Sequence, residues 1–337
     1  MRHLITLALA AFALFSNTSC QYIISKANQG DSSTISGKQG DVLVVINKDY
    51  WESELGQMIR DSLTAEYPML PQVEPRFKVS YVAHSGFSSM FQIQRNIVEV
   101  DIDPTNVNTV SFRKNVWATP QCVVTLKADN YEKAIELFKE NAAKIIRTIE
   151  GAERERIINN NAAYSSIGVE NEVKKMFGGS PVFPKEAKIL MKTNNFIWIA
   201  TCNTDYIKKY IILYKYPVVK GEDMMSRSSI IQHNLEAVNK NIPGTREGSF
   251  MTHSKFVDPT FEYIKYNNKS FAEIRGLWDV ENDYMGGPFV ANVLYSPDGR
   301  YMVGIEGFIY APKFDKIQHT RDVEAVVYSF KWNETKK

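Results

Sequence analysis

The chain has 337 residues, with 40 Lys and Arg against 38 Asp and Glu and a formal net charge of +2. Acidic and basic residues are interspersed, so the sequence lacks the basic stripe of a nucleic-acid-binding protein, and we expect no nucleic-acid partner. Its three cysteines are too few for a fold built on disulfides. The length predicts two domains or one large domain.

Residues 1–19 have the pattern of a signal peptide. Arg2 supplies positive charge, an apolar run extends from Leu4 to Phe15, and small polar residues follow. The apolar run is too short to span a bilayer, which needs about 20 residues. The alternative, a buried N-terminal helix, does not explain this order of apolar, small and polar residues. We therefore expect the chain to be exported.

Cys20 stands at the acceptor position of a bacterial lipoprotein signal, so we expect its thiol to be diacylated and to anchor the chain in a membrane. Asn17 departs from the pattern, because an aliphatic residue is usual three positions before that cysteine. Gln21 follows without an acidic cluster, which favours an outer-membrane lipoprotein that faces the periplasm. Residues 20–40 are rich in Ser, Gly, Lys and Gln and predict a flexible tether.

Residues 41–178 predict an α/β half. A continuous aliphatic run from Asp41 to Ile46 is typical of a central strand covered on both faces. Apolar residues at helical spacing then predict a helix from about Tyr50 to Glu66. The other elements predicted in this half are strands at 77–82, 96–102 and 116–127 and helical stretches at 87–94 and 169–177.

This half also contains a long predicted helix. Asp129 lies three residues before Glu132, in the spacing of a capping box, and an apolar stripe follows up to residue 149. The charged continuation over residues 150–161 predicts the solvated face of a surface helix that connects the two halves. On that face we expect Glu150 and Arg154 to pair, four residues apart.

Residues 179–337 predict a mainly antiparallel half. Ser296-Pro297-Asp298-Gly299 predicts a hairpin turn, since proline presets the first bend and glycine supplies positive φ. With flanking helices on one face of this sheet, the whole chain is expected to have an α+β fold. The predicted strands are 188–191, 196–201, 210–216, 250–253, 261–266, 271–280, 289–295 and 301–310, and the predicted helices are 226–240 and 316–328.

The cysteines and histidines of the body give no sign of a redox or metal site. Cys122 and Cys202 lie in apolar, strand-like runs, where an unpaired cysteine behaves as a small buried residue, although a bridge between them stays open. No two histidines have metal-ligand spacing, and no nucleophile elbow or phosphate-binding loop occurs. We expect no cofactor and no metal, and the sequence identifies no catalytic residue.

A candidate cleft surrounds Gly286-Gly287-Pro288, a sequence that predicts a tight turn between strands. Glu273, Arg275 and Asp279 alternate with apolar neighbours, so we expect them near one another on a strand pair. Trp278 and Tyr284 are candidates for the walls of the cleft. The candidate cleft residues are Glu273, Arg275, Trp278, Asp283, Tyr284 and Glu306, and Glu306 is expected to face the same side from a later strand.

Two interpretations of this cluster stay open. Paired carboxylates about 5 to 9 Å apart could act as general acid and base, as in sugar-cleaving enzymes. The alternative, which we favour, is a solvated sheet face on which Arg275 bridges carboxylates. A second, weaker candidate site in the first half consists of Arg95, Trp117 and Gln121, which lie near predicted strand ends.

Several motifs resemble those of an uncharacterised Bacteroidota lipoprotein family, domain of unknown function 4837. They are Val116-Trp117-Ala118-Thr119-Pro120-Gln121, Ile242-Pro243-Gly244 with Glu247-Gly248, Arg275-Gly276-Leu277-Trp278, and Asp283-Tyr284-Met285-Gly286-Gly287-Pro288-Phe289. The resemblance extends from about Asp41 to the C-terminus. It implies a lipoprotein of a Gram-negative envelope, and it implies neither an activity nor catalytic residues.

Two classes of function follow from the sequence. The first, which we prefer, is a non-catalytic binding or accessory module of the cell envelope that holds a protein, peptide or glycan in a cleft between the halves. The second is a periplasmic hydrolase that acts on a glycan or peptide through Glu273, Asp283 and Glu306.

Overall fold

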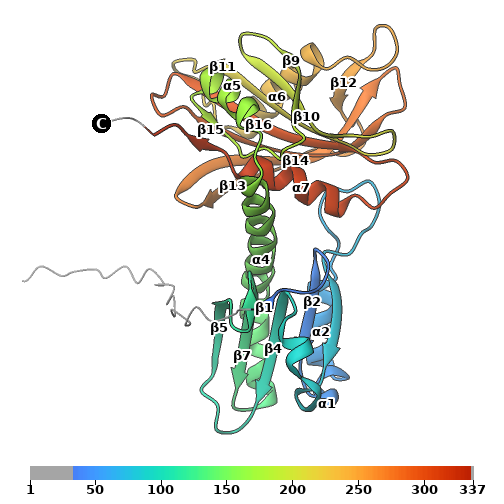
Figure 1. The fold of residues 1–337 in the computed structure, drawn as a ribbon, viewed down its shortest axis with the longest axis vertical. Helices are drawn as coiled ribbons and strands as arrows, with labels where there is room; N and C mark the ends of the chain where they lie inside the picture. The colour runs from blue at the N-terminus through green and yellow to red at the C-terminus, as the bar shows by residue number, and fades with distance from the viewer. Residues whose placement is uncertain (1–32, 335–337) are drawn as a thin grey trace, which may run out of the picture. The chain divides into compact units, whose positions relative to one another are not determined.

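Two large β-sheets and a long helix, α4 (Tyr131–Ala163), organise residues 33–334, the part of the chain that a computed structural model describes (Figure 1). The predicted signal peptide, Cys20 and residues 20–32 of the predicted tether lie outside the described residues. No helix within residues 33–334 combines the length and apolarity needed to cross a membrane.

The first sheet has five strands in the order β3-β2-β4-β7-β5, parallel except for β5. Helix α2 and the first half of α4 cover one face, where Leu55, Ile59 and Phe138 enter the core. The elements of this half are β2 (Asp41–Val45), α1 (Lys48–Trp51), α2 (Glu54–Leu63), β3 (Lys78–Val82), α3 (Ser89–Gln92), β4 (Asn96–Ile102), β5 (Thr109–Lys114) and β7 (Cys122–Ala128).

Three details of this half differ from the sequence prediction. Strand β5, whose residues are half-buried or exposed, was not predicted, and the run at 116–127 divides into the short β6 (Ala118–Thr119) and β7. Strand β1 (Ser33–Thr34), at the end of the predicted tether, pairs in parallel with β6. The N-cap of α4 is Asn130, not Asp129, because the Asn130 side chain accepts a hydrogen bond from the Lys133 amide at 2.8 Å.

The second sheet has eight strands, antiparallel throughout, in the order β12-β14-β15-β16-β11-β10-β9, with β13 paired to β14 beside β12. The predicted strands are all present, and the α+β fold is confirmed. Their bounds are β9 (Lys188–Lys192), β10 (Phe196–Asn203), β11 (Lys208–Pro217), β12 (Phe250–His253), β13 (Thr260–Tyr266), β14 (Lys269–Glu281), β15 (Gly286–Tyr295) and β16 (Tyr301–Tyr310).

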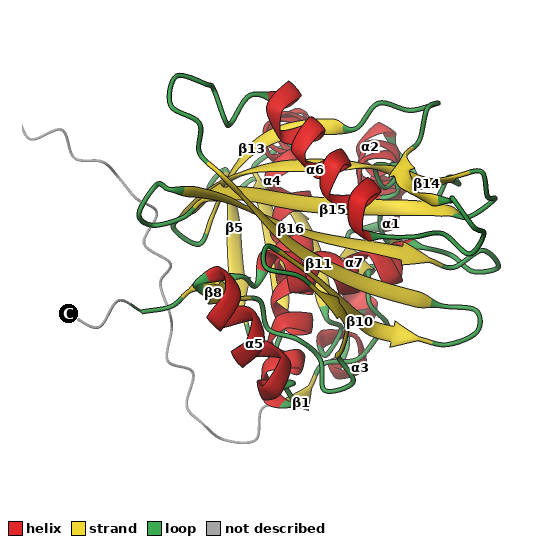
Figure 2. Ribbon diagram, turned by 90° about the horizontal axis from the view of Figure 1, so that it is seen from above, coloured by secondary structure: helices red, strands yellow, loops and turns green. Residues whose placement is uncertain are grey.

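Helices cover both faces of this sheet, whereas the sequence placed them on one face. Helix α6 (Arg227–Asn241) lies across one face (Figure 2), and α5 (Ile167–Phe177) and α7 (Ile317–Tyr328) pack against the other. Gly307 allows α7 to approach, because a Cβ at this position would lie 2.7 Å from the Cβ of Val323. Helix α5 follows α4 in the chain yet contributes to the core of the second sheet, and it ends at Gly178, which has the left-handed conformation.

The two turns predicted in this half have different outcomes. The Ser296–Gly299 hairpin is present, and Gly299 has the positive φ that its position requires. Gly286-Gly287-Pro288 does not form a turn but begins β15, and Gly287 pairs with Trp278. A Cβ on Gly287 would lie 2.2 Å from the carbonyl oxygen of Ile309, so this glycine serves the close approach of two strands.

Candidate functional site

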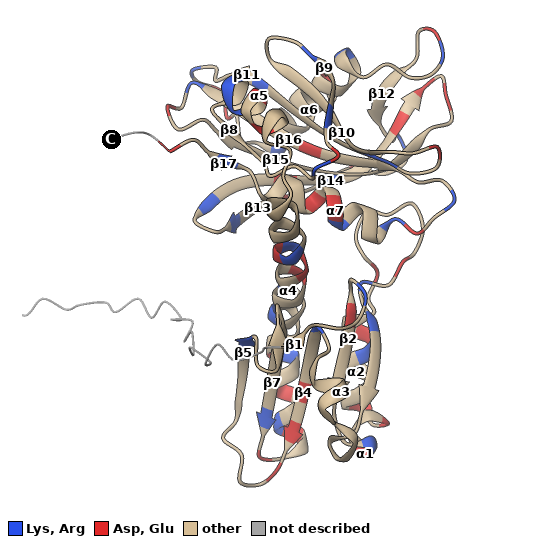
Figure 3. Ribbon diagram, viewed as in Figure 1, with Lys and Arg blue, Asp and Glu red and all other residues tan. Residues whose placement is uncertain are grey.

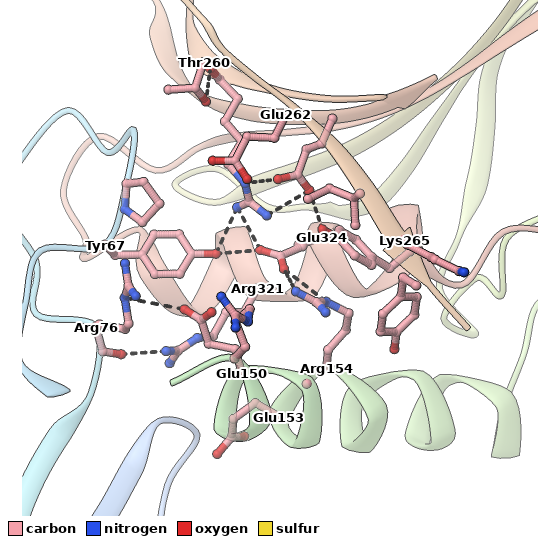
Figure 4. Close-up of a pocket in the computed structure, with 18 residues that line it drawn as sticks. Tyr67, Arg76, Glu150, Glu153, Arg154, Thr260, Glu262, Lys265, Arg321 and Glu324 are labelled. Carbon is pink, nitrogen blue, oxygen red and sulfur yellow. Dashed lines mark hydrogen bonds and ion pairs between the residues drawn. The ribbon is translucent and has the colours of Figure 1, made fainter. Parts of the chain in front are cut away.

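A cavity of about 350 Å³ lies between the two halves, with walls from α4, α7, the β13–β14 hairpin and the segment before β3 (Figure 4). Six cationic and five acidic side chains line it, together with Tyr67, Tyr266 and Tyr328. Figure 3 shows charged residues on α4 and α7 where these helices meet. The charged residues of the lining are Arg76, Arg147, Arg154, Lys265, Arg275, Arg321, Glu150, Glu153, Glu262, Glu273 and Glu324.

Glu324 of α7 is the centre of the charged network. One of its carboxylate oxygens accepts two hydrogen bonds from Arg154 of α4, one of them from Nε at 3.1 Å. The other oxygen accepts a hydrogen bond from Arg275 of β14 at 3.0 Å. The Tyr67 hydroxyl also donates to Glu324, at 2.5 Å. Glu324 thereby joins α4, β14 and the segment before β3.

Arg275 and Glu273 extend this network along β14. Arg275 donates from Nε to Glu273 at 2.7 Å and from a terminal nitrogen to its other oxygen at 3.1 Å, which makes a bidentate pair. The Tyr328 hydroxyl donates to Glu273 at 2.5 Å, and the ring of Tyr328 lies 3.8 Å from the guanidinium carbon of Arg154. Each acidic group of this network therefore contacts both an arginine and a tyrosine.

Counter-ions decide the charge state of these groups. Burial alone would raise the pKa of Glu324, but Arg275 and Arg154 outweigh burial and hold that pKa well below its usual range. Burial opposes the charge of Arg275 too, yet Glu273 and Glu324 raise its pKa above the usual value. The centre of the network is consequently a set of ionised, paired groups.

The charged stretch of α4 was predicted as a solvated face, and that prediction is wrong. Arg154 pairs with Glu324, not with Glu150, and Glu150 lies 3.5 Å from the Nε of Arg76. Glu153 is only 1% exposed and accepts hydrogen bonds from Arg95 at 2.6 Å and Asn96 at 2.7 Å. The reason is that partners from distant parts of the chain replace water around these charges.

The second candidate site, Arg95, Trp117 and Gln121, is brought together by the structure. The Gln121 side-chain amide donates to the carbonyls of Gln92 and Gln94, and its oxygen accepts from the Trp117 amide at 3.0 Å. Arg95 also lines a second cavity, of about 430 Å³, with Arg156 of α4. The contacts of Gln121 fix the local backbone.

Of the six predicted cleft residues, only Glu273 and Arg275 line the cavity between the halves. Trp278 is 3% exposed and donates to the Ile309 carbonyl at 3.1 Å within the core on the α6 face. Tyr284 is 91% exposed. Asp283, in the same turn, accepts hydrogen bonds from the Tyr284 amide and the Thr245 hydroxyl and forms an ion pair with Arg246. The six residues therefore do not form one cleft.

Glu306 lies on the α6 face, opposite Glu273 and Arg275, and so does not face the same side. Its carboxyl accepts from the Asn234 amide at 2.5 Å, and Asn234 in turn accepts from His253 at 2.7 Å and donates to Tyr214 at 3.0 Å. Burial raises the pKa of Glu306 to about 8, and burial lowers the pKa of His253 to about 4. Near neutral pH this cluster is mainly uncharged.

Among residues 33–334, no group of three or more His, Cys, Asp or Glu side chains is arranged to hold a metal ion. Cys122 and Cys202 are both unpaired, as the preferred interpretation of the sequence had it.

Sequence reasoning missed Tyr67, Arg154, Arg321 and Glu324. One signal was available for two of them. Arg321 and Glu324 are charged residues within α7, whose positions 320 and 321 and 323–328 are all buried. A helix buried over so much of its surface must bring its charges to partners.

Comparisons with known proteins give families without an assigned activity. None of the curated proteins matches the chain. A crystal structure from Bacteroides thetaiotaomicron VPI-5482, determined at 1.50 Å resolution, matches with 9% identity and a TM-score of 0.25, and the match covers 48% of this chain. The chain spans 47% of the length of that structure.

The family models divide the chain close to the end of α4. Residues 35–162 match Domain of unknown function (DUF8532), so the expected single resemblance from Asp41 to the C-terminus is too long. The motif at 116–121 lies in that first segment, and the other motifs quoted for the resemblance lie in the second. Residues 166–329 match the model of Domain of unknown function (DUF4837), which confirms the predicted resemblance over that part of the chain.

Proposed function

We propose that the protein is an exported, non-catalytic binding module of the cell envelope and that its ligand enters the cavity between α4, α7 and the β13–β14 hairpin. The apolar leader and Cys20 support export and lipid anchoring at the outer membrane, facing the periplasm. The cavity supports binding, because clefts between parts of a fold are the usual location of ligand sites.

One observation carries the proposal of binding over catalysis. The carboxylates at the centre of the cavity, Glu273 and Glu324, are each held by an arginine and a tyrosine. A general acid or base needs a pKa near the working pH and a proton that it can transfer. The low pKa of Glu324 and its fixed partners favour a positioned, ionised group that recognises a ligand.

The hydrolase alternative loses its structural basis. Glu273 faces α7, Glu306 faces α6, and Asp283 lies in the turn before β15. A pair of carboxylates must flank the same bond of the substrate, at opposite sides of one site. Residues on opposite faces of a sheet do not meet this requirement.

Site-specific photocrosslinking in whole cells tests the cavity as the binding site. Lys265 is an exposed residue of the lining, and Lys240 is an exposed lysine on α6, across the sheet. A benzophenone amino acid at Lys265 should give a crosslinked product that the same group at Lys240 does not give. Equal crosslinking at both positions, or none at Lys265, would count against a ligand in the cavity.

Lipid anchoring is tested separately. Radiolabelled palmitate should be incorporated into the chain and should disappear in Cys20→Ala. Labelling that persists in this variant would show that Cys20 is not the acylated residue.

A further inference from the structure

We propose that the ligand of this cavity is an extended acidic peptide, whose carboxylate pairs with Arg321 and Arg76 while its backbone lies along the free edge of β13. This inference rests on the proposed binding function and names the chemistry of the ligand.

The lining of the cavity has more positive than negative groups. Its six cationic side chains against five carboxylates leave one positive charge in excess. Because charges in a poorly solvated wall require partners, an anionic group from outside is favoured at this position.

Arg321 is the buried cation of the lining that has no counter-ion among the described residues. It is 6% exposed, and within residues 33–334 it forms no ion pair with a carboxylate. It donates a hydrogen bond of 2.6 Å to the backbone carbonyl of Arg76, and the rings of Tyr67 and Phe77 lie 5.7 and 5.4 Å from its guanidinium. A buried guanidinium that donates to one neutral carbonyl retains N–H groups for a ligand.

Arg76 lies beside Arg321 and is also incompletely paired. Its Nε is closed to solvent and has no hydrogen-bond partner among the described residues. The carboxylate of Glu150 is 3.5 Å away, close enough for attraction but without hydrogen-bond geometry. Burial raises the pKa of Glu150, and Arg76 opposes this only in part. We regard Glu150 as a weakly held internal anion that a ligand carboxylate can displace.

The charge balance favours a carboxylate over a phosphate. A single excess positive charge matches a monoanion, whereas a phosphate monoester carries about −1.5 to −2 at neutral pH. A guanidinium group such as that of Arg321 also matches the planar, bidentate geometry of a carboxylate.

Strand β13 provides a reason to expect a peptide. It pairs only with β14 within the described sheet, so its outer edge has backbone groups without a strand partner. The same strand lines the cavity with Glu262, Ile264 and Tyr266. An exposed strand edge next to a side-chain pocket is the arrangement in which an extended peptide adds to a sheet and inserts one side chain. Arg147 and Lys265 at the rim would attract an acidic segment.

Three fluorescent probes test the inference with the purified full chain. The first is the peptide Ala-Val-Thr-Val-Glu-amide with a fluorescent dye on its N-terminal amine, the second has Gln in place of Glu, and the third is the Gln peptide with a free C-terminal carboxylate. By fluorescence anisotropy, at least one carboxylate peptide should bind about tenfold more tightly than the neutral one. Comparison of the first and third probes distinguishes a side-chain carboxylate from a chain terminus. An acidic oligosaccharide that displaces the probe and itself binds more tightly would exclude a peptide as the preferred ligand.

Variants connect the binding to the proposed residues. Arg321→Gln should abolish the preference for Glu over Gln, and the exposed Arg147→Ala should weaken the acidic peptide several-fold. Lys139→Ala, on the same helix but away from the cavity, is the matched control. Glu150→Gln should strengthen binding of the acidic peptide, because it removes the competing carboxylate, and a residue with a purely structural role would not have this effect.

The outcomes separate the two proposals. If Lys265 crosslinks to a partner but the acidic and neutral peptides bind equally or not at all, the inference fails and the binding function stands. If Lys265 crosslinks to nothing and no probe binds, both fail. Thermal melting of every variant shows whether a loss of binding reflects a loss of fold, and Arg147→Ala then serves as the test that does not depend on Arg321.

Discussion

Glu324 and Glu306 are buried carboxyl groups on opposite faces of the same sheet, and they have opposite charge states. Glu324 belongs to α7, which packs on one face of the sheet, and is 5% exposed, whereas Glu306 is fully buried on the other face beneath α6. The pKa of Glu324 is lowered well below its usual range, whereas that of Glu306 is raised to about 8. Burial acts in the same direction on both groups.

The difference comes from their partners. Two guanidinium groups and a tyrosine hydroxyl contact Glu324, but Glu306 has one amide donor, from Asn234. A neutral amide does not repay the cost of burying a carboxylate, so Glu306 keeps its proton. The ionised cluster also adjoins the cavity, whereas the neutral cluster is enclosed by its own half. The position of each residue in the sequence alone would not reveal this difference in charge state.

The largest expected effect is that of removing the charge of Glu324. Glu324→Gln leaves Arg154 and Arg275 without one of their counter-ions in a buried site, which should destabilise the protein by about 3–5 kcal/mol. Urea unfolding followed by circular dichroism would measure the change in the free energy of unfolding.

Asp322→Asn is the matched control for Glu324→Gln. Asp322 lies on the same helix and pairs with Lys209 at 2.9 Å, but its side chain is 36% exposed. The loss of such a partly solvated pair should cost about 1 kcal/mol or less. Equal costs for the two variants would show that the ionised cluster has no special role.

The neutral cluster should make stability depend on pH. The raised pKa of Glu306 gives stability that is present below its unfolded value of 4.5 and lost as pH rises toward 8. The lowered pKa of His253 gives stability that is present above 6.5 and lost as pH falls toward 4. Between pH 4.5 and 6.5 the two groups change the free energy of unfolding in opposite directions. Above pH 6.5 only Glu306 still changes it, and it lowers stability. Stability should then fall by about 1.4 kcal/mol per pH unit, or roughly 2 kcal/mol between pH 6.5 and 8.

Glu306→Gln isolates this contribution. Glutamine has a similar shape and does not ionise, so the fall above pH 6.5 should be absent in the variant. The free energy of unfolding is measured by urea titration at several pH values between 6.5 and 8. A variant with the same slope as the original protein would show that another group is responsible.

The sequence predicted the strands of the second sheet because each of them has a strong local signal. Strand β16, for example, is bounded by the Ser296–Gly299 turn, and its run of apolar residues needs no knowledge of the partner strands. The sequence could not place Glu306, since β16 is buried on both faces and lacks the alternation that would identify the outer side. The face occupied by Glu306 depends on the register with β11 and β15.

The charged part of α4 illustrates a different limit. Local spacing favoured a pair between Glu150 and Arg154, but the actual partner of Arg154 is 170 residues away in the chain. The sequence of a charged helix can be the same whether water or another helix surrounds its side chains. Only the contact between α4 and α7 distinguishes the two cases, so the sequence predicted Glu273 and Arg275 of the cavity lining but not its charged residues on α4 and α7.

The smallest expected effect compares one tyrosine from each cluster. Tyr328 donates to the carboxylate of Glu273, which pairs with Arg275, and Tyr214 accepts from the neutral Asn234. Tyr328→Phe should destabilise the protein by about 1.5–3 kcal/mol, because hydrogen bonds to charged groups contribute more. Tyr214→Phe should cost about 1 kcal/mol or less, since Asn234 keeps its bond to Glu306. Both values come from urea unfolding at pH 7.

Both substitutions remove one hydroxyl from a buried ring, so the cost of the changed packing is matched. The difference between the two variants therefore compares a hydrogen bond donated to a carboxylate with one accepted from a neutral amide. A larger loss for Tyr214→Phe would mean that the α6 cluster is ionised in the folded protein. In that case the fall in stability above pH 6.5 should be absent as well, and the two measurements together would decide whether Glu306 holds its proton.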